Sequence, residues 1–331
     1  MIRVRFPAGV EPPRWLGDRP GAVEVTRDPA VVAAEGEKNG SRQSAAVDRV
    51  LRPAFRRMWS GGPRTFGLVS VETRAGCNYG CTFCAVSRHA DPRRPGELSL
   101  ALLDRIAGQL ADLSFGGRVS LFGNNEPLLD TRIVGIVGMF RSTCAPADLR
   151  LLTNGTRATA DLVTALFEAG LTTLVINNYT DGRRLIRPVR DLIGSADRLA
   201  PYDIRISVRS RTEVLTTRAG SAPNKPVPET RPRGFCALPF TDLHIAYTGD
   251  VTLCCFDAYG RVPMGNVADT PLTEIWRSER FAAYRQRLLS SVRGGLCETC
   301  DFDGFRDPRV GHRDPPLTRD ALDVQEPEKC R

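Results

Sequence analysis

The chain has 331 residues, of which 41% are hydrophobic and 25% charged, so we expect one large globular domain with room for a small second one. No run of eighteen apolar residues is present and the N-terminus lacks the apolar core of a signal peptide, so we expect no membrane association and a cytoplasmic location. The net charge of +8 comes mostly from scattered arginines, which we attribute to codon usage, so we expect no nucleic-acid partner.

Residues 1–60 are interpreted as an N-terminal extension. They are rich in proline, arginine and charge, with turn signals at Pro12-Pro13 and Pro20-Gly21 and no clear strand pattern. Residues 45–59 have the spacing of a helix that is interrupted near Pro53. We expect this extension to pack on, or partly cover, the main domain.

Residues 61–215 predict an α/β domain. A β-rich run at 66–73 is followed by alternating elements. The expected helices are 98–113, 132–140, 160–169 and 185–199, and the expected strands are 118–122, 149–153, 172–177 and 202–208. Repeated βα units require a parallel sheet, here of five or six strands, short of a full eight-stranded barrel. Functional groups on such sheets gather at the carboxyl ends of the strands.

The last third of the chain predicts a second, smaller domain. Residues 216–235 are rich in proline and predict a linker. Residues 236–310 follow, with an expected hairpin of strands 242–247 and 251–256 and an expected helix at 272–289. Residues 311–331 are interpreted as a C-terminal tail.

Ten cysteines are many for a cytoplasmic protein, and their clustering favours metal ligation over disulfides. The loop from Cys77 through Cys81 to Cys84 has the spacing C-x3-C-x2-C. Three thiolates can hold three irons of a four-iron cluster and leave the fourth iron open, although such clusters normally have four cysteines. The alternatives are three unrelated cysteines or a zinc site with a remote ligand, but zinc sites usually pair C-x2-C units.

This motif resembles that of the radical S-adenosylmethionine (SAM) superfamily. In that family the open iron binds SAM, and one electron cleaves SAM to methionine and a 5′-deoxyadenosyl radical, which abstracts hydrogen from an unactivated C–H bond. The resemblance implies a partial (β/α)6 TIM-like barrel, a [4Fe–4S] cluster bound to SAM, and an electron donor such as flavodoxin or ferredoxin.

A second group of cysteines consists of Cys236, Cys254, Cys297 and Cys300. Four thiolates can close a whole cluster, but on spacing alone a structural zinc site is a serious alternative. The run C-x12-G-x4-C, in which Gly249 is the fixed glycine, followed by C-x2-C, resembles the SPASM and twitch extensions of radical SAM enzymes. No cysteine follows until Cys330, so the resemblance implies the shorter twitch form, with one auxiliary [4Fe–4S] cluster.

Other positions match the family residue by residue. Gly123-Asn124-Asn125-Glu126 follows the second strand of the main domain, where the family usually has a Gly-Gly-Glu motif that meets the SAM ammonium group. The resemblance implies this role for Glu126 and a close backbone approach at Gly123, while two asparagines replace the usual glycines. It also implies the following SAM contacts: Phe83 at the adenine, Thr153 and Asn154 at the ribose-facing edge, Asn177 at a ribose hydroxyl and Arg209 near the carboxylate. Turn chemistry alone would also explain residues 153–155 and 177–178.

The reaction depends on Cys255, which is spare once Cys254 is a ligand. A spare thiol could donate a hydrogen atom to the substrate radical and invert a stereocentre, whereas electron loss to the auxiliary cluster would give a ketone. The cysteine pair could also be a packing feature of the hairpin. We therefore expect dehydrogenation or epimerisation of a small polar natural product such as an aminoglycoside. The alternatives are maturation of a ribosomally made peptide and a zinc-stapled nucleic-acid binder, of which the last would leave residues 123–127 unexplained.

Overall fold

The computed structural model describes residues 1–7, 11–13, 16, 22–27, 49, 52–57, 65–229 and 234–302. Within these ranges, ten strands form one open sheet in the order β10-β9-β8-β3-β4-β5-β6-β7-β1-β2. The strands are β1 (Ile2–Phe6), β2 (Val23–Arg27), β3 (Leu68–Val71), β4 (Arg118–Ser120), β5 (Asp148–Thr153), β6 (Thr173–Tyr179), β7 (Asp203–Arg209), β8 (Asp242–Ile245), β9 (Asp250–Thr252) and β10 (Pro263–Asn266).

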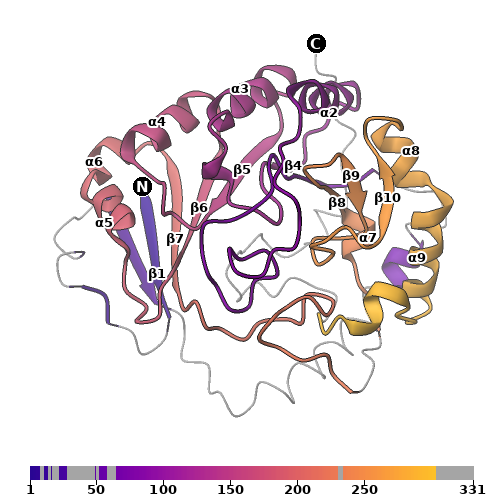
Figure 1. The fold of residues 1–331 in the computed structure, drawn as a ribbon. Coiled ribbons are helices and arrows are strands. Elements are labelled where there is room, and N and C mark those ends of the chain that lie inside the picture. The colour runs from indigo at the N-terminus through magenta and orange to yellow at the C-terminus, as the bar shows by residue number, and fades with distance from the viewer. Residues whose placement is uncertain are drawn as a thin grey trace.

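The helices divide into two groups, one along the parallel strands and one at the β10 end of the sheet (Figure 1). The first group is α2 (Leu100–Asp112), the 3-10 turn η2 (Pro127–Leu129), α3 (Ile133–Thr143), α4 (Ala160–Glu168), α5 (Arg187–Gly194) and α6 (Ala196–Leu199). The second group is α7 (Leu238–Thr241), α8 (Leu272–Arg277), α9 (Glu279–Leu289) and the 3-10 turn η3 (Gly295–Thr299).

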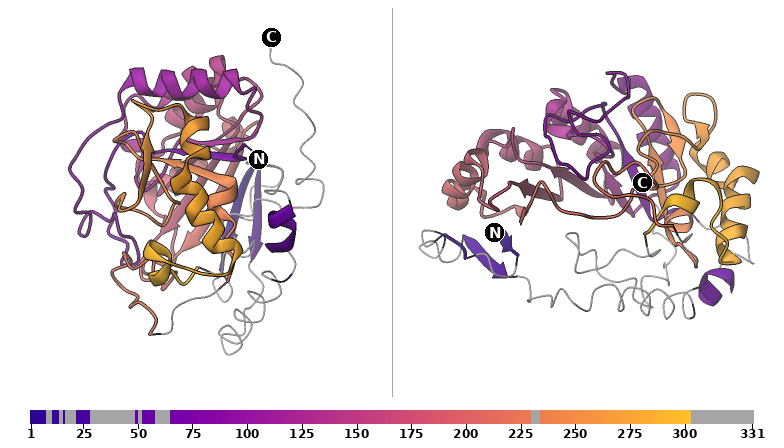
Figure 2. Two further views of the ribbon diagram at one scale, coloured as in Figure 1. Left: turned by 90° about the vertical axis from the view of Figure 1, so that its right-hand side faces the viewer. Right: turned by 60° about the horizontal axis from the view of Figure 1, so that its bottom comes forward.

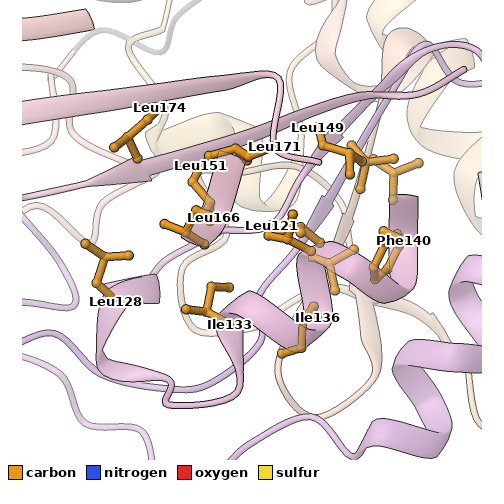
Figure 3. Packing of buried hydrophobic residues seen from close by; sticks show 14 of the residues in the cluster. Leu121, Leu128, Ile133, Ile136, Phe140, Leu149, Leu151, Leu166, Leu171 and Leu174 are labelled. Carbon is orange, nitrogen blue, oxygen red and sulfur yellow. The ribbon is translucent and has the colours of Figure 1, made fainter. Parts of the chain in front are cut away.

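The expected parallel sheet is confirmed, since β3, β4, β5, β6 and β7 pair in parallel and in chain order. The core between this sheet and its helices follows from helical periodicity. Ile133, Ile136, Val137 and Phe140 share one face of α3 at helical spacing and are buried against the sheet (Figure 3). Because every βα unit runs the same way, the loops that leave the strands collect at one edge.

The prediction that the N-terminal extension lacks strands was wrong. β1 pairs in parallel with β7, from Ile2 opposite Ile204 to Arg5 opposite Ser207, and β2 pairs in parallel with β1. Each strand has five residues in a proline-rich context, so the alternation in the sequence was too short to stand out. The parallel position beyond β7 is therefore filled from the start of the chain, on the opposite side of the molecule from α9 (Figures 1 and 2).

The same extension also reaches the other end of the sheet. Of the expected helix 45–59, residues 52–57 are helical, and most of the remainder lies outside the described residues. The ring of Phe55 packs 5.0 Å from that of Phe235 and 5.6 Å from that of Phe240, measured between ring centroids. The extension thus contacts both β7 and the segment that enters α7.

Three predictions for the second domain were wrong in detail. β9 ends at Thr252, so Cys254 and Cys255 lie in the turn that follows the strand. A third strand, β10, pairs antiparallel with β9. The single helix expected at 272–289 is divided into α8 and α9 at Ser278, whose hydroxyl accepts a hydrogen bond from the backbone N–H of Phe281 at 3.3 Å and caps α9. Residues 303–331, which include the expected tail, lie outside the described part of the chain.

Candidate active site

The loop that carries Cys77, Cys81 and Cys84 leaves the carboxyl end of β3 and is anchored at both flanks. Gly76 forms a parallel bridge with Asn125, and the backbone N–H of Thr82 donates to the carbonyl of Arg211 at 2.9 Å. Each of the three thiols influences the ionisation of another, so they lie close together. Burial raises the pKa of Cys77 to about 12, and that of Cys81 further. Such thiols are expected to ionise only when a metal binds them, which fits the proposed cluster.

Glu126 joins this loop to the ends of two neighbouring strands. Its side chain is buried, and it accepts hydrogen bonds from the Thr153 hydroxyl at 2.5 Å, the Asn154 backbone N–H at 2.7 Å and the Leu128 backbone N–H at 3.0 Å. Burial raises the pKa of Glu126, while these three donors oppose that rise. Both carboxylate oxygens are therefore already bonded within the chain, and a SAM ammonium group would be an additional donor.

Asn154, at the end of β5, faces the cysteine loop directly. Its side-chain amide donates to the side-chain oxygen Oδ1 of Asn78 at 2.9 Å and to the Cys77 sulfur at 3.6 Å. Asn78 in turn donates to the Thr156 hydroxyl at 2.8 Å. Thr153 and Asn154 thus lie beside both Glu126 and the cysteines, in keeping with the predicted SAM edge.

Phe83 and Arg209 meet at Tyr179, a residue that the sequence reasoning missed. The ring of Phe83 lies 5.3 Å from that of Tyr179, and the Arg209 guanidinium lies 5.7 Å from the centre of the same ring. Arg209 forms an ion pair with Glu213 at 2.5 Å, which occupies the guanidinium that was predicted to approach the SAM carboxylate. Asn177 is buried on the same strand, β6, two residues before Tyr179. The sequence could have indicated Tyr179, because it is an aromatic residue just after an expected strand.

Asn124, which replaces a family glycine, reaches across to the second domain. Its amide nitrogen donates to the Cys255 carbonyl at 3.3 Å, and its amide oxygen accepts from the Arg218 guanidinium. Asn125, the other replacement, stays within its own loop, where its side chain accepts from the Gly123 N–H at 2.9 Å. At Gly123 an added Cβ would lie 3.0 Å from the Glu72 Cβ, so the close approach shown here is to β3 and its following residue.

Glu72 and Arg93 contact the loop that contains Gly123 and Asn124, and the sequence reasoning missed both. Arg93 donates to Glu72 at 2.8 Å, to both carboxylate oxygens of Asp91, and to the Asn124 carbonyl at 2.6 Å. Burial raises the pKa of Glu72 to about 7, and Arg93 opposes that rise. Glu72 directly follows β3, and an acidic residue at the end of a buried strand was the signal for it.

The second cysteine group comes from three segments, namely the entry to α7 (Cys236), the turn after β9 (Cys254), and η3 with the residue that follows it (Cys297 and Cys300). Cys254 is buried, and its thiol influences or is influenced by each of the other three. Burial raises the pKa of Cys297 to about 11. Cys255 is more exposed than Cys254 and shares its intermediate exposure with Cys236 and Cys297, so exposure does not distinguish it from the ligands.

All nine cysteines in the described ranges are free thiols. Within those ranges, no group of three or more His, Cys, Asp or Glu side chains is placed to hold a single metal ion. A four-iron cluster requires a wider arrangement than one ion, because each thiolate binds a different iron.

The predicted linker is held against the second domain by an unusual backbone. Arg218, Ala219 and Gly220 have φ values of +47°, +52° and +79°, a left-handed run that non-glycine residues rarely adopt. The Ala219 N–H bonds to the Cys300 sulfur, and the Thr217 hydroxyl donates to the Thr299 carbonyl at 2.7 Å. The Nε–H of Arg218 is buried without a hydrogen-bond partner among the described residues.

Comparison with known proteins matches two domains. Residues 71–199 match the radical SAM superfamily, and residues 236–301 match the SPASM iron–sulfur cluster-binding domain. The chain is 27% identical over 242 residues to an S-adenosyl-L-methionine-dependent 2-deoxy-scyllo-inosamine dehydrogenase from Niallia circulans, covering 72% of this chain and 94% of that protein.

Two solved structures are similar in fold. BtrN in complex with AdoMet and 2-DOIA superposes with a TM-score of 0.62 at 26% identity, covering 72% of this chain and 94% of that one. SuiB from Streptococcus suis bound to S-adenosylmethionine gives 0.52 at 15% identity, covering 83% and 88%. The likeness to SuiB concerns the fold alone. No helix among the described residues is long and apolar enough to span a membrane.

Proposed function

Because this chain is a radical SAM enzyme with a SPASM-type iron–sulfur domain, we propose that it dehydrogenates a secondary alcohol of an aminocyclitol or aminoglycoside. The observation that carries the proposal is the match to a 2-deoxy-scyllo-inosamine dehydrogenase over 94% of that protein's length. The agreement therefore includes the auxiliary domain and not the radical SAM domain alone.

The cysteines fit the two cofactors that these domains use. Cys77, Cys81 and Cys84 would hold the cluster that binds SAM. The auxiliary cluster would be held by Cys236, Cys254, Cys297 and Cys300. SAM held at the first site would supply the capacity to abstract a hydrogen atom from a substrate carbon.

The remaining residues bind and orient. Glu126 and Asn154 fix the edge at which SAM binds, and Tyr179 with Phe83 forms an aromatic wall beside it. Arg218 lies at the junction of the two domains, where its guanidinium donates to Asn124 and orients that loop. Conversion of the alcohol to a ketone then balances as one hydrogen atom to the deoxyadenosyl group, one proton to solvent and one electron to the auxiliary cluster.

The test is anaerobic turnover of the reconstituted enzyme with SAM, a reductant and 2-deoxy-scyllo-inosamine. The expected product is lighter than the substrate by two hydrogen atoms, and deuterium placed at the reacting carbon is expected in 5′-deoxyadenosine. A panel that includes other aminocyclitols and an unrelated ribosomal peptide separates the alternatives. Turnover of the peptide, with no reaction of any aminocyclitol, would instead support peptide maturation.

Epimerisation is a second candidate because of where Cys255 lies. Its carbonyl is bonded to Asn124, so the residue sits at the junction of the two domains and is more exposed than Cys254. An epimerase would return a product of unchanged composition that carries solvent deuterium, and Cys255→Ala would abolish that incorporation. In a dehydrogenase, Cys255→Ala leaves ketone formation intact.

We further propose that a flavodoxin or ferredoxin supplies the electron at the cysteine loop. Arg88 and His89 are exposed there, and an added Cβ at Gly80 would lie 3.0 Å from the His89 ring. Electron carriers of this class are acidic, so the positive side chain of Arg88 next to the cluster loop favours their docking. Arg88→Glu should slow reduction by flavodoxin at low ionic strength and leave reduction by dithionite unchanged.

A further inference from the structure

Arg293 is a buried cation placed among the auxiliary cysteines. It follows α9 and precedes η3, and its side chain is 8% exposed. The guanidinium donates to the carbonyls of Phe302 at 2.7 Å, Cys300 at 3.2 Å, Gly234 at 3.3 Å and Phe235 at 3.4 Å. Two of these carbonyls immediately precede Cys236 and the other two flank the end of η3. One side chain thus ties together two segments that carry three of the four ligands.

The charge of Arg293 has no carboxylate partner in the part of the chain that the structure describes, because all its acceptors are neutral carbonyls. A buried charge is costly unless it is compensated. The acceptors themselves place this cation against the auxiliary ligands, because they include the carbonyl of Cys300 and the two carbonyls that precede Cys236. A cluster held by those ligands would carry negative charge and would compensate the guanidinium.

A four-iron cluster on four thiolates is an anion and becomes more negative on reduction. A fixed cation beside it stabilises the reduced form more than the oxidised form, so it raises the reduction potential. Dehydrogenation, in the function proposed above, requires the auxiliary cluster to accept an electron from the substrate radical. We infer that Arg293 is the positioning residue that fixes the auxiliary ligand segments and raises the potential of their cluster, which favours this electron transfer.

The inference is tested on the auxiliary cluster alone, without substrate. Replacing Cys77, Cys81 and Cys84 by Ala removes the first cluster, and the second is reconstituted, counted as iron per chain and titrated by electron paramagnetic resonance. In this background, Arg293→Gln is expected to lower the equilibrium constant for reduction at least tenfold, which is 59 mV for one electron. Arg293→Lys retains the charge but cannot bond four carbonyls, so its potential is expected to stay closer to that of the parent.

The control is Arg287→Gln, which removes the same charge from an exposed position on α9 and is expected to leave the potential unchanged. A fully loaded Arg293→Gln cluster with the parent's potential would overturn the inference. If the Arg293→Gln variant does not take up the auxiliary cluster, the potential of the Arg293→Lys variant is measured instead. If neither variant takes up the cluster, Arg293 has a purely structural role and the inference about the potential is overturned. Since no substrate is present, this measurement is independent of the proposed function. A shifted potential would support the inference about Arg293 even if no aminocyclitol is turned over. An unchanged potential would contradict the inference even if an aminocyclitol is turned over.

Discussion

The two cysteine groups of this chain are built in opposite ways. The first lies on one eight-residue loop, and its neighbours belong to the edge of the parallel sheet. The second is gathered from three segments across residues 236–300 and is held by Arg293 and by the left-handed turn at 218–220. The first therefore depends on a local motif and the second on a folded domain. This difference matches the roles proposed for them, in which the first group leaves one iron open for SAM and the second closes around its cluster.

The largest expected effect comes from breaking the first group. Cys77→Ala, Cys81→Ala or Cys84→Ala should abolish reductive SAM cleavage, because each removes a ligand of the only cluster that binds SAM. The auxiliary cluster should still load in each variant. Chromatography of 5′-deoxyadenosine, together with iron counting, checks this prediction. Residual 5′-deoxyadenosine in any variant would contradict it.

The next comparison sets Cys254 against Cys255. Cys254 is buried and interacts with all three other auxiliary thiols, so Cys254→Ala should lose about four irons per chain, one auxiliary cluster. SAM cleavage should persist while ketone formation is lost. Cys255→Ala is the matched control and should keep the full iron content. The reverse pattern would make Cys255 the ligand.

Asn124 connects the two groups, so replacing it should uncouple them. Asn124→Gly restores the usual family residue and removes two side-chain hydrogen bonds, one to Cys255 in the second domain and one to Arg218 in the segment before it. At about 0.5–1.5 kcal/mol per bond, the two together are worth about 1–3 kcal/mol, so the yield of product per 5′-deoxyadenosine should fall roughly fivefold to a hundredfold. Asn125→Gly, which breaks only a local bond, should alter SAM binding without this loss of coupling. An equal yield of product per 5′-deoxyadenosine in both variants would show that the hydrogen bonds of Asn124 to Cys255 and Arg218 are dispensable.

The smallest expected effect concerns the buried carboxyl group of Glu72, which directly follows β3. Burial raises the pKa of Glu72 to about 7 against the opposing effect of Arg93, so the folded chain binds its proton more tightly than the unfolded chain does. This contribution to the stability of the iron-free protein is therefore present in full below the unfolded pKa and is lost as the pH rises through about 7. The slope is at most about 1.4 kcal/mol per pH unit. Glu72→Gln should flatten the dependence in denaturant unfolding between pH 5 and 8, and an unchanged slope would contradict the assignment to Glu72.

Local signals accounted for most of what could be predicted. Helical periodicity located α2, α3 and α4 within a few residues, and the cysteine spacing identified the loop that resembles the radical SAM motif. The single helix expected at 185–199 is divided into α5 and α6 at Ser195. The capping hydroxyl of Ser278 likewise divided a helix whose apolar spacing read as continuous. Periodicity reports which face of an element is buried, and it does not report how one element ends and the next begins.

Long-range contacts account for what was missed. β1 is a strand because β7, about two hundred positions later, offers it a free edge. Asn124 looked like a departure from a glycine-rich loop, and its role appears only when Cys255 and Arg218 are beside it. Arg293 is one of many arginines in the sequence, and nothing local marks it as the one that bonds four carbonyls around the auxiliary ligands.

The pairing of β1 with β7 also has a consequence during synthesis of the protein. A ribosome makes β1 first and needs roughly 10–40 s to reach β7 at the usual 5–20 residues per second. During that interval β1 is a strand without its partner, the kind of segment that aggregates. Its alternate residues Arg3 and Arg5 carry charge on the face that is not buried in the core, which keeps the waiting strand soluble. The sheet edge can close only after all five strands of the βα series have been synthesised.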